Sequence, residues 1–150
     1  MLRLGNERDI DTILGLVLKF FRETEYSHLT PNLDNTRSLI AQFVSKLDED
    51  SVCILWEKDG KVTGILAGQI LPLPFFGCKV ATESMWWVEP EARGTEAAVH
   101  LLDSFEYWAK LKGASMIQMA HLNNRTGNVV SRLYRRRGFK KSEITHVKEL

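Results

Sequence analysis

The sequence predicts an α+β fold in three α/β/α layers, with helices on both faces of a central mixed, mostly antiparallel sheet. Segments with helical spacing of apolar residues alternate with β-forming runs, in the order β-α-α-β-β-β-α-β-α-β-β. This order combines a meander of strands with crossover helices, which is typical of a layered α+β fold. The 150 residues, 44% of them hydrophobic, are enough for a buried core. We therefore expect a single domain over residues 1–150.

The first half of the chain predicts one strand and two amphipathic helices. Residues 1–4 predict a strand and residues 5–9 a turn, while the polar residues 24–33 predict a loop between the helices. Asp34 or Asn35 is the expected cap of the second helix. Two apolar stripes define the buried faces: Ile10, Ile13, Leu14, Val17, Leu18 and Phe21 in the first helix, and Leu39, Ile40, Phe43, Val44 and Leu47 in the second.

A hairpin and a third strand follow in the middle of the chain. Asp59 and Gly60 form a strong hairpin signal between β-forming residues, and Pro72 and Pro74 are expected to exclude a central strand, which predicts a loop over residues 71–77. The remaining elements follow in order: strands at 52–57, 62–70 and 80–88, a helix at 95–112, a strand at 115–120, a loop at 123–128, a helix at 129–137, and short strands near 139–142 and 144–148.

Composition and charge narrow the class of protein. The net charge is +1, and no apolar run reaches the roughly 18 residues of a membrane span. No secretory signal is visible at the N-terminus, so a cytoplasmic location is expected. The two cysteines, Cys53 and Cys78, make neither a disulfide framework nor a zinc site, and no spacing of ligating residues predicts a metal. Cys53 is expected to be a buried thiol.

Residues 88–102 carry the most informative pattern, a strand end followed by a tight turn and a helix start. Arg93, Gly94 and the small residues Ala97 and Ala98 lie where the helix begins. A helix N-terminus presents free backbone N–H groups and the positive end of the helix dipole, so it suits a phosphate. Small side chains let a bulky anion approach the backbone. These residues therefore predict a phosphate-binding turn.

Two motifs together resemble the acyl-CoA-binding core of the GNAT family of N-acetyltransferases. The family's phosphate loop reads Gln/Arg-x-x-Gly-x-Gly/Ala, and Arg93 and Ala98 match its first and last positions, whereas Glu96 replaces a glycine. A Val-x-Pro turn and two aliphatic residues flank the loop here, at Val88-Glu89-Pro90 and Leu101-Leu102. The second motif resembles Leu-Tyr-x-x-x-Gly-Phe and is matched by Leu133, Tyr134, Gly138 and Phe139.

The resemblance implies acetyl-CoA as acyl donor, bound where strands 80–88 and 115–120 splay apart. Backbone N–H groups of residues 94–98 would hold the pyrophosphate, and residues 86–88 would hydrogen-bond the pantetheine arm. Glu96 is compatible with a pyrophosphate if its carboxylate points to solvent or pairs with a cation. The expected cofactor-binding residues are Trp86, Trp87, Val88, Arg93, Gly94, Thr95, Glu96, Ala97, Ala98, Asn128, Ser131 and Arg135.

Acetyl transfer to an amine needs a base for the ammonium and an acid for the departing thiolate. The resemblance implies that Tyr134 is the acid, and Glu83, ten residues before Arg93, is the candidate base. The alternatives are a core-edge tyrosine and a solvent-facing or ion-paired glutamate, with water relaying the proton. Trp86 and Trp87 point to opposite faces of the strand, so one is expected in the core and the other near the acceptor.

The acceptor amine is unidentified, and other classes of function compete with catalysis. A catalytically degenerate acyl-CoA-binding or adaptor domain would fit Glu96 and the position of Asn128, one residue from where the family often has asparagine. A binding module for protein or nucleic acid could use the basic residues between Arg132 and Lys141, although few aromatic residues for base stacking lie among them. Dimerisation through the last strands is the expectation from the family.

Overall fold

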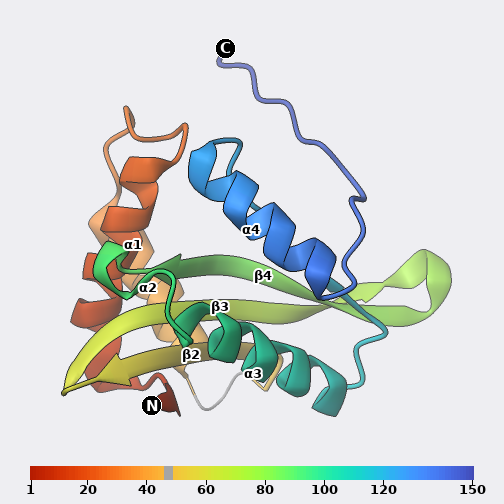
Figure 1. The fold of residues 1–150 in the computed structure, drawn as a ribbon, viewed down its shortest axis with the longest axis horizontal. Helices are drawn as coiled ribbons and strands as arrows, with labels where there is room; N and C mark the ends of the chain where they lie inside the picture. Colours follow the sequence, from red (N-terminus) through yellow and green to blue (C-terminus); the bar gives the residue numbers. More distant parts are fainter. Residues whose placement is uncertain (46–48) are drawn as a thin grey trace. The chain divides into compact units, whose positions relative to one another are not determined.

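The computed structural model describes residues 1–45 and 49–150, and it divides into two compact units, Met1–Met119 and Ala120–Leu150. Leu47, which was expected in the second apolar stripe, lies outside the described residues. The first unit holds the sheet and three helices (Figure 1). Its strands are β1 (Leu2–Leu4), β2 (Ser51–Lys58), β3 (Lys61–Leu73), β4 (Cys78–Val88) and β5 (Met116–Gln118). Its helices are α1 (Ile10–Glu23), α2 (Leu33–Val44) and α3 (Ala97–Leu111), with 3₁₀ turns η1 (Glu7–Asp9), η2 (Pro74–Phe76) and η3 (Pro90–Ala92).

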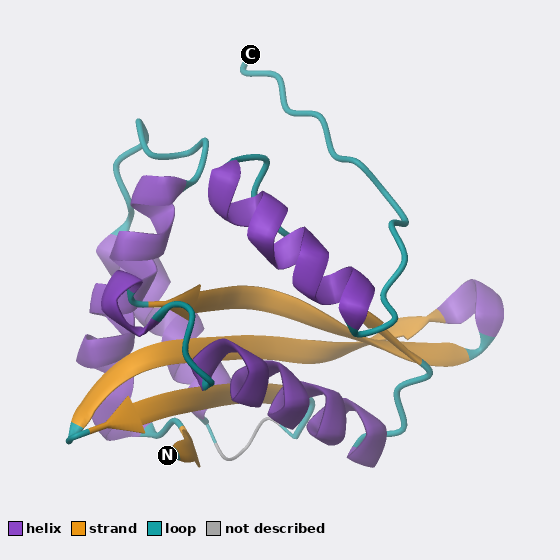
Figure 2. Ribbon diagram, in the orientation of Figure 1, coloured by secondary structure: helices purple, strands orange, loops and turns teal. Residues whose placement is uncertain are grey.

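The sheet of the first unit is mixed and mostly antiparallel, as the sequence predicts. Its strands lie in the order β1-β2-β3-β4-β5, and the first four pair antiparallel with their neighbours. β5 joins β4 in parallel, because α3 connects the two strands as a crossover. Figure 2 shows the long β3–β4 hairpin, with η2 at its tip.

Helices cover both faces of this sheet and make the three expected layers (Figure 1). The side chains of α1 and α2 pack with one set of strand residues, which includes Leu55, Ile65 and Trp87. α3 packs on the opposite face with a second set, which includes Leu66 and Ala81. Each face therefore has its own apolar core, and the sheet between them is held rigidly from both sides.

Asparagine side chains begin two of the helical segments. Asn6 and Asp9 form a reciprocal capping box ahead of α1, in which each side chain accepts from the other residue's backbone N–H. Asn32 caps α2 by accepting from the N–H of Asn35. The expectation that Asp34 or Asn35 would cap this helix is therefore wrong, because the helix begins at Leu33, one residue before Asp34.

β3 extends through Pro72, so the predicted loop over residues 71–77 is wrong for its first half. β2 pairs with β3 only as far as Ser51 and Gln69, whereas β4 continues to pair up to Leu73 and Cys78. Pro72 therefore lies in a two-stranded ribbon with one open side. A proline is tolerated there because its missing N–H is not needed by a strand on that side.

The second unit consists of a helix and extended segments. α4 (Arg125–Arg136) begins four residues earlier than predicted, because Asn124 caps it by accepting from the N–H of Gly127 at 2.8 Å. The strands predicted near 139–142 and 144–148 are wrong, since residues 137–150 contain no strand. Alternating β-forming residues do not make a strand unless their backbone groups pair with a neighbouring strand.

Candidate functional site

Along its C-terminal half, one edge of β4 pairs with no other described strand of the first unit. It pairs with β5 over three residues only, Val80–Thr82 against Met116–Gln118. Within the described strands of the first unit, the rest of β4 pairs with β3 alone. The two strands therefore stop pairing after Thr82 and Gln118, as the predicted splaying requires, and within the described part of the first unit no other strand covers this edge of β4.

A β-bulge marks the point on β4 where the two strands have separated. Ala67 pairs with Met85 and the adjacent Gly68 pairs with Glu83, so Ser84 is the extra residue of the bulge. A bulge increases the local twist and redirects the neighbouring side chains. Glu83, the candidate base, is half-buried and immediately precedes the bulge. This bulge has no signature in the sequence, since the register of a strand pair cannot be read from one strand.

The start of α3 presents free backbone donors directly after β4. Gly94 has φ of 77°, which turns the chain toward the helix. The Thr95 hydroxyl donates to the carbonyl of Ala92 at 2.7 Å and accepts from the N–H of Ala97 at 3.3 Å. The first intrahelical acceptor is the Glu96 carbonyl, which bonds His100. The N–H groups of Ala98 and the residue after it therefore precede the helix ladder and are available to an anion.

Arg93 fastens this turn to the end of β4 and to α1. Its Nε donates to the carbonyl of Val88 at 2.9 Å, and its Nη2 donates to Oε1 of Glu23 at 3.1 Å. The guanidinium also lies over the Trp87 ring, 4.6 Å from the ring centre. The Arg93 side chain thus positions the turn, and we expect its contribution to ligand binding to come through the backbone.

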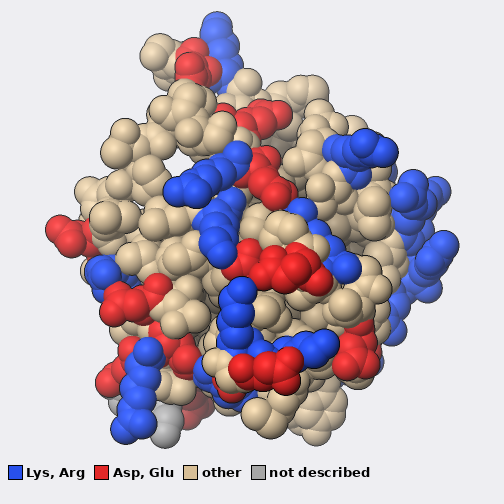
Figure 3. All heavy atoms as spheres, turned by 60° about the vertical axis from the view of Figure 1, so that its left-hand side comes forward, with Lys and Arg blue, Asp and Glu red and all other residues tan. Residues whose placement is uncertain are grey.

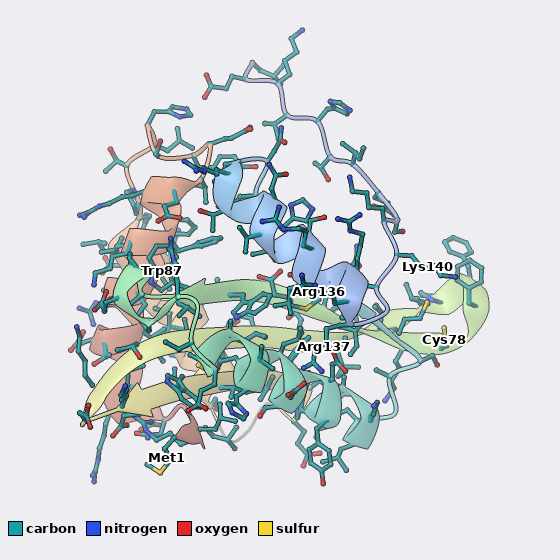
Figure 4. All side chains as sticks on the ribbon, in the orientation of Figure 1. Met1, Cys78, Trp87, Arg136, Arg137 and Lys140 are labelled. Carbon is teal, nitrogen blue, oxygen red and sulfur yellow. The ribbon has the colours of Figure 1, made fainter. Side chains whose placement is uncertain are left out.

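The two tryptophans of β4 lie on opposite faces, as predicted. Trp87 is buried on the α1 side, where its ring meets Phe20 edge to face with centroids 6.4 Å apart (Figure 4). Trp86 packs against the α3 core and is partly buried. The core residue of the pair is therefore Trp87.

The Glu96 carboxylate points into solvent, as the predicted binding of a pyrophosphate at this turn requires. Its side chain is 70% exposed, and its Oε2 lies 3.8 Å from Nε2 of His100. His100 in turn stacks on Trp56 with an interplanar angle of 4° and centroids 5.4 Å apart. A carboxylate in solvent interacts weakly with a nearby anion, because water screens the charges.

Glu89 is a structural residue of the turn that the sequence analysis missed. It follows β4 and is 3% exposed, and its carboxylate pairs with Nζ of Lys19 on α1. Its backbone N–H donates to the carbonyl of Thr63 at 2.9 Å. A buried carboxylate is tolerated only with such partners. Glu89 therefore fixes where β4 ends and the turn begins.

A charged groove of about 430 Å³ lies near the N-terminus of α1. Arg3 bonds both Asp9 and Glu57, at 2.8 and 2.6 Å, and the guanidinium of Arg3 holds the pKa of Asp9 below its usual value. On the face of the molecule that Figure 3 shows, Lys and Arg side chains lie beside Asp and Glu side chains. The groove thus contains paired charges of both signs.

In the second unit, the candidate acid Tyr134 is a buried residue of α4. Its hydroxyl donates to the carbonyl of Ala120 at 2.7 Å, and its ring packs with those of Phe139 and His121, with centroids 5.2 and 6.3 Å away. Asn128, Ser131 and Arg135, the expected cofactor residues of this unit, follow the i, i+3, i+7 spacing of one helix face.

The basic residues of the second unit are exposed, as a solvated face would be. Arg132, Arg135, Arg136 and Lys140 are all exposed, and Figure 4 labels Arg136, Arg137 and Lys140 at and after the end of α4.

Gly127 lies where the family often has asparagine. A Cβ at Gly127 would lie 1.6 Å from the Leu122 carbonyl oxygen, so no side chain fits at this position.

The two cysteines have opposite environments within the first unit. Cys53 is buried in β2, and desolvation raises the pKa of its thiol to about 12, so the reactive thiolate is disfavoured at neutral pH. Cys78 is half-buried near the tip of the β3–β4 hairpin (Figure 4). Across the part of the chain that the structure describes, no three ligating side chains are grouped to hold a metal, and no helix is long and apolar enough to cross a bilayer.

The model of the acetyltransferase (GNAT) family matches residues 15–139. The chain therefore belongs to the GNAT acetyltransferase family.

Solved structures with this fold have little sequence in common with the chain. A transcriptional regulator from Bacillus halodurans C-125 is 22% identical, with a TM-score of 0.77 and coverage of 100% of this chain and 99% of that one. A ribosomal-protein-alanine N-acetyltransferase from Brucella melitensis biovar Abortus 2308 is 17% identical, with a TM-score of 0.71 and coverage of 100% and 99%. The aminoglycoside N-acetyltransferase AAC(6')-Iy in complex with CoA is 15% identical, with a TM-score of 0.76 and coverage of 100% and 93%. No curated protein sequence matched the chain.

Proposed function

We propose that this protein is an N-acetyltransferase that transfers an acetyl group from acetyl-CoA to a primary amine, by direct attack in a ternary complex. The observation that carries the proposal is the continuous segment from the C-terminal half of β4 to the first turn of α3. It offers a strand edge that no described strand of the first unit covers and, after it, the N–H groups of Ala98 and the next residue, which precede the helix ladder. The family match supports the reaction class, and the CoA complex of a neighbour with the same fold supports the ligand.

The described residues of this segment fit acetyl-CoA. A pyrophosphate needs N–H donors and room, and the α3 start supplies both, since a Cβ at Gly94 would meet no atom within 4 Å. The pantetheine arm carries amide groups, which can pair with the backbone of residues 86–88 as an added strand would. The proposed phosphate-binding residues are Gly94, Thr95, Glu96, Ala97 and Ala98, with Asn128, Ser131 and Arg135 of the second unit as further contacts.

Acetyl-CoA supplies an activated thioester carbonyl, and the protein must accept one proton from the amine and donate one to the thiolate. The C–S bond breaks as the C–N bond forms, so the amine loses a proton and the thiolate gains one. We assign the first proton to Glu83, beside the bulge, or to water that it orients, and the second to Tyr134, whose phenol O–H would turn from the Ala120 carbonyl to the thiolate. A backbone N–H of residues 86–88 would donate to the carbonyl oxygen as it gains charge.

The proposed acceptor is a small amine or an amine on a protein. The fold neighbours include an enzyme named for ribosomal-protein alanine and several named for aminoglycosides, which are both classes of amine. A panel of peptide N-termini, lysine peptides, polyamines and aminoglycosides would therefore identify the acceptor. Release of the CoA thiol would report turnover.

Ligand binding is tested first by thermal shift with CoA, acetyl-CoA and ATP. We expect both CoA forms to stabilise the protein, by about 2.7 kcal/mol at 100 times the dissociation constant, because they bind the folded state only. ATP serves as the control for non-specific phosphate binding. No shift with either CoA form would contradict the proposal. A shift without turnover on any amine would favour the alternative, a catalytically degenerate acyl-CoA-binding domain.

Replacing Glu96 with glycine is expected to leave CoA affinity unchanged or to raise it. The exposed carboxylate contributes repulsion toward a pyrophosphate, and glycine removes it without altering the backbone donors. Isothermal titration of CoA into E96G and the parent protein measures the difference. A large loss of affinity would mean instead that Glu96 organises the turn.

A further inference from the structure

An apolar cavity of about 120 Å³ lies between α1, α2 and the sheet of the first unit. Its walls include Phe20 of α1, Thr36 and Leu39 of α2, and Ser84 and Met85 of β4. Ser84 is the bulge residue and Met85 follows it, so the cavity adjoins β4 where its pairing with β5 has ended. The proposed function assigns this cavity no role.

The cavity lining accepts an apolar group and opposes a charged one. None of the residues around it is Asp, Glu, Lys or Arg. The Thr36 hydroxyl already donates to the carbonyl of Asn32 at 2.7 Å, and the Cys53 thiol, with its raised pKa, is neutral. An ammonium group in this lining would lose its hydration without gaining a counter-charge. The cavity therefore disfavours the charged ammonium form of the acceptor as its occupant.

The size of the cavity corresponds to a short hydrocarbon chain. A dry apolar cavity of about 150 Å³ is known to hold benzene, which has six carbon atoms. A cavity of 120 Å³ is thus suited to a chain of roughly four to six carbons. An acetyl group, with its single methyl, would fill little of it.

The distance along β4 brings the acyl end of the proposed ligand to this place. A strand rises about 3.3 Å per residue, so Ser84 lies about 13 Å along the chain from Val88. If the phosphates lie at the α3 start and the pantetheine arm extends along this edge of β4 toward Ser84, the thioester is the part of the ligand nearest the bulge. Any hydrocarbon beyond the thioester carbonyl then lies beside Met85 and the cavity.

We propose that this cavity receives the aliphatic tail of an acyl group longer than acetyl, so that the protein binds short-chain acyl-CoA donors such as butyryl-CoA and hexanoyl-CoA. This inference rests on the proposed function, because it takes the CoA part to lie along β4. Thr36 at the cavity rim and Ala67 on its sheet side are the residues whose size limits the chain.

Isothermal titration of CoA, acetyl-, butyryl-, hexanoyl- and decanoyl-CoA tests the inference. Each buried methylene is expected to strengthen binding about fourfold, so butyryl-CoA should bind about 15-fold more tightly than acetyl-CoA. The gain should stop between hexanoyl and decanoyl, where the cavity is full. Thr36→Trp and Ala67→Leu should abolish the gain and leave the affinity for CoA itself unchanged. Ser38→Trp, on α2 and exposed, is the matched control and should keep the preference.

The outcomes separate this inference from the proposed function. Equal or weaker binding of butyryl-CoA than acetyl-CoA would overturn the inference and leave the proposed function standing. A preference for longer chains that survives in both filled variants would also overturn it, because the chain would then lie elsewhere. Absence of binding by every CoA species would overturn both. If Ala67→Leu fails to fold, Thr36→Trp still decides the matter, since its side chain is added at the rim.

Discussion

Replacing Tyr134 with phenylalanine is expected to lower turnover by about 100-fold or more while CoA affinity stays nearly constant. The change removes only the hydroxyl, and loss of a general acid typically costs 10²–10⁴ in rate. It also removes the hydrogen bond to the carbonyl of Ala120, so a stability loss of about 1 kcal/mol is expected beside the rate effect. Thiol release from acetyl-CoA with the selected amine measures turnover, and titration of CoA measures binding.

A matched variant separates the catalytic effect from the structural one. Tyr107 on α3 is 65% exposed, so Tyr107→Phe should change neither turnover nor stability. A pH profile adds a second criterion, because loss of the acid should remove or shift the limb of the profile that depends on it. Unchanged turnover in Tyr134→Phe would leave Tyr134 as a core tyrosine that orders Ala120 and Phe139, and the acid would then have to be sought elsewhere.

Replacing Gly68 with alanine is expected to destabilise the protein by about 3 kcal/mol. A Cβ at this position would lie 2.6 Å from a ring carbon of Phe105 and 2.6 Å from the carbonyl oxygen of Thr82. Phe105 is fully buried in the α3 core, and the Thr82 oxygen belongs to the backbone of the paired strand β4. A shift of either group is therefore energetically costly. Overpacking of this kind usually costs 1–3 kcal/mol, and contact with the backbone places this site at the upper end. Urea unfolding followed by circular dichroism would measure the change.

Gly15 is the control for this substitution. It is an exposed residue within α1, and a Cβ there would meet nothing within 4 Å. Alanine favours the helix over glycine by roughly 1 kcal/mol, so Gly15→Ala should stabilise the protein. Because Gly68 pairs with Glu83 across the bulge, Gly68→Ala should also weaken CoA binding, whereas Gly15→Ala should not. A loss below 1 kcal/mol in Gly68→Ala would contradict the tight packing of α3 on β3.

The turn before α3, for which we propose phosphate binding, illustrates how much local structure can be predicted from a short stretch of chain. Strand end, proline turn and helix start are all set by residues within about ten positions of one another, so local chemistry specifies them. Gly94, Ala97 and Ala98 were predicted at the helix start, and the structure places them there. Splaying of strands 80–88 and 115–120 was expected from the family resemblance, and in the structure their pairing ends at Thr82 and Gln118.

The wrong predictions have two causes, which are the strand neighbours of a segment and the residue that caps a helix. Pro72 argues against a strand only where strands lie on both sides, and here β2 has already ended. Residues 139–148 have the alternation of strands, yet alternation describes a side-chain pattern and not a hydrogen-bond partner. The early start of α4 was missed because Asn124 was read as a loop residue, whereas its side chain caps the helix.

The sequence by itself determined the order and type of most elements, the two apolar faces of the sheet and the turn before α3, because periodicity and turn chemistry act within a few residues. Only the tertiary structure decided the bulge at Ser84, the anchoring of Arg93 to Trp87 and Glu23, the burial of Glu89 and the apolar cavity beside Met85. Each of these depends on atoms that are distant in the chain and meet only when the helices pack on the sheet. Packing between distant segments is specified by the complementary shape of many side chains at once, so it has no signature in any single stretch of sequence.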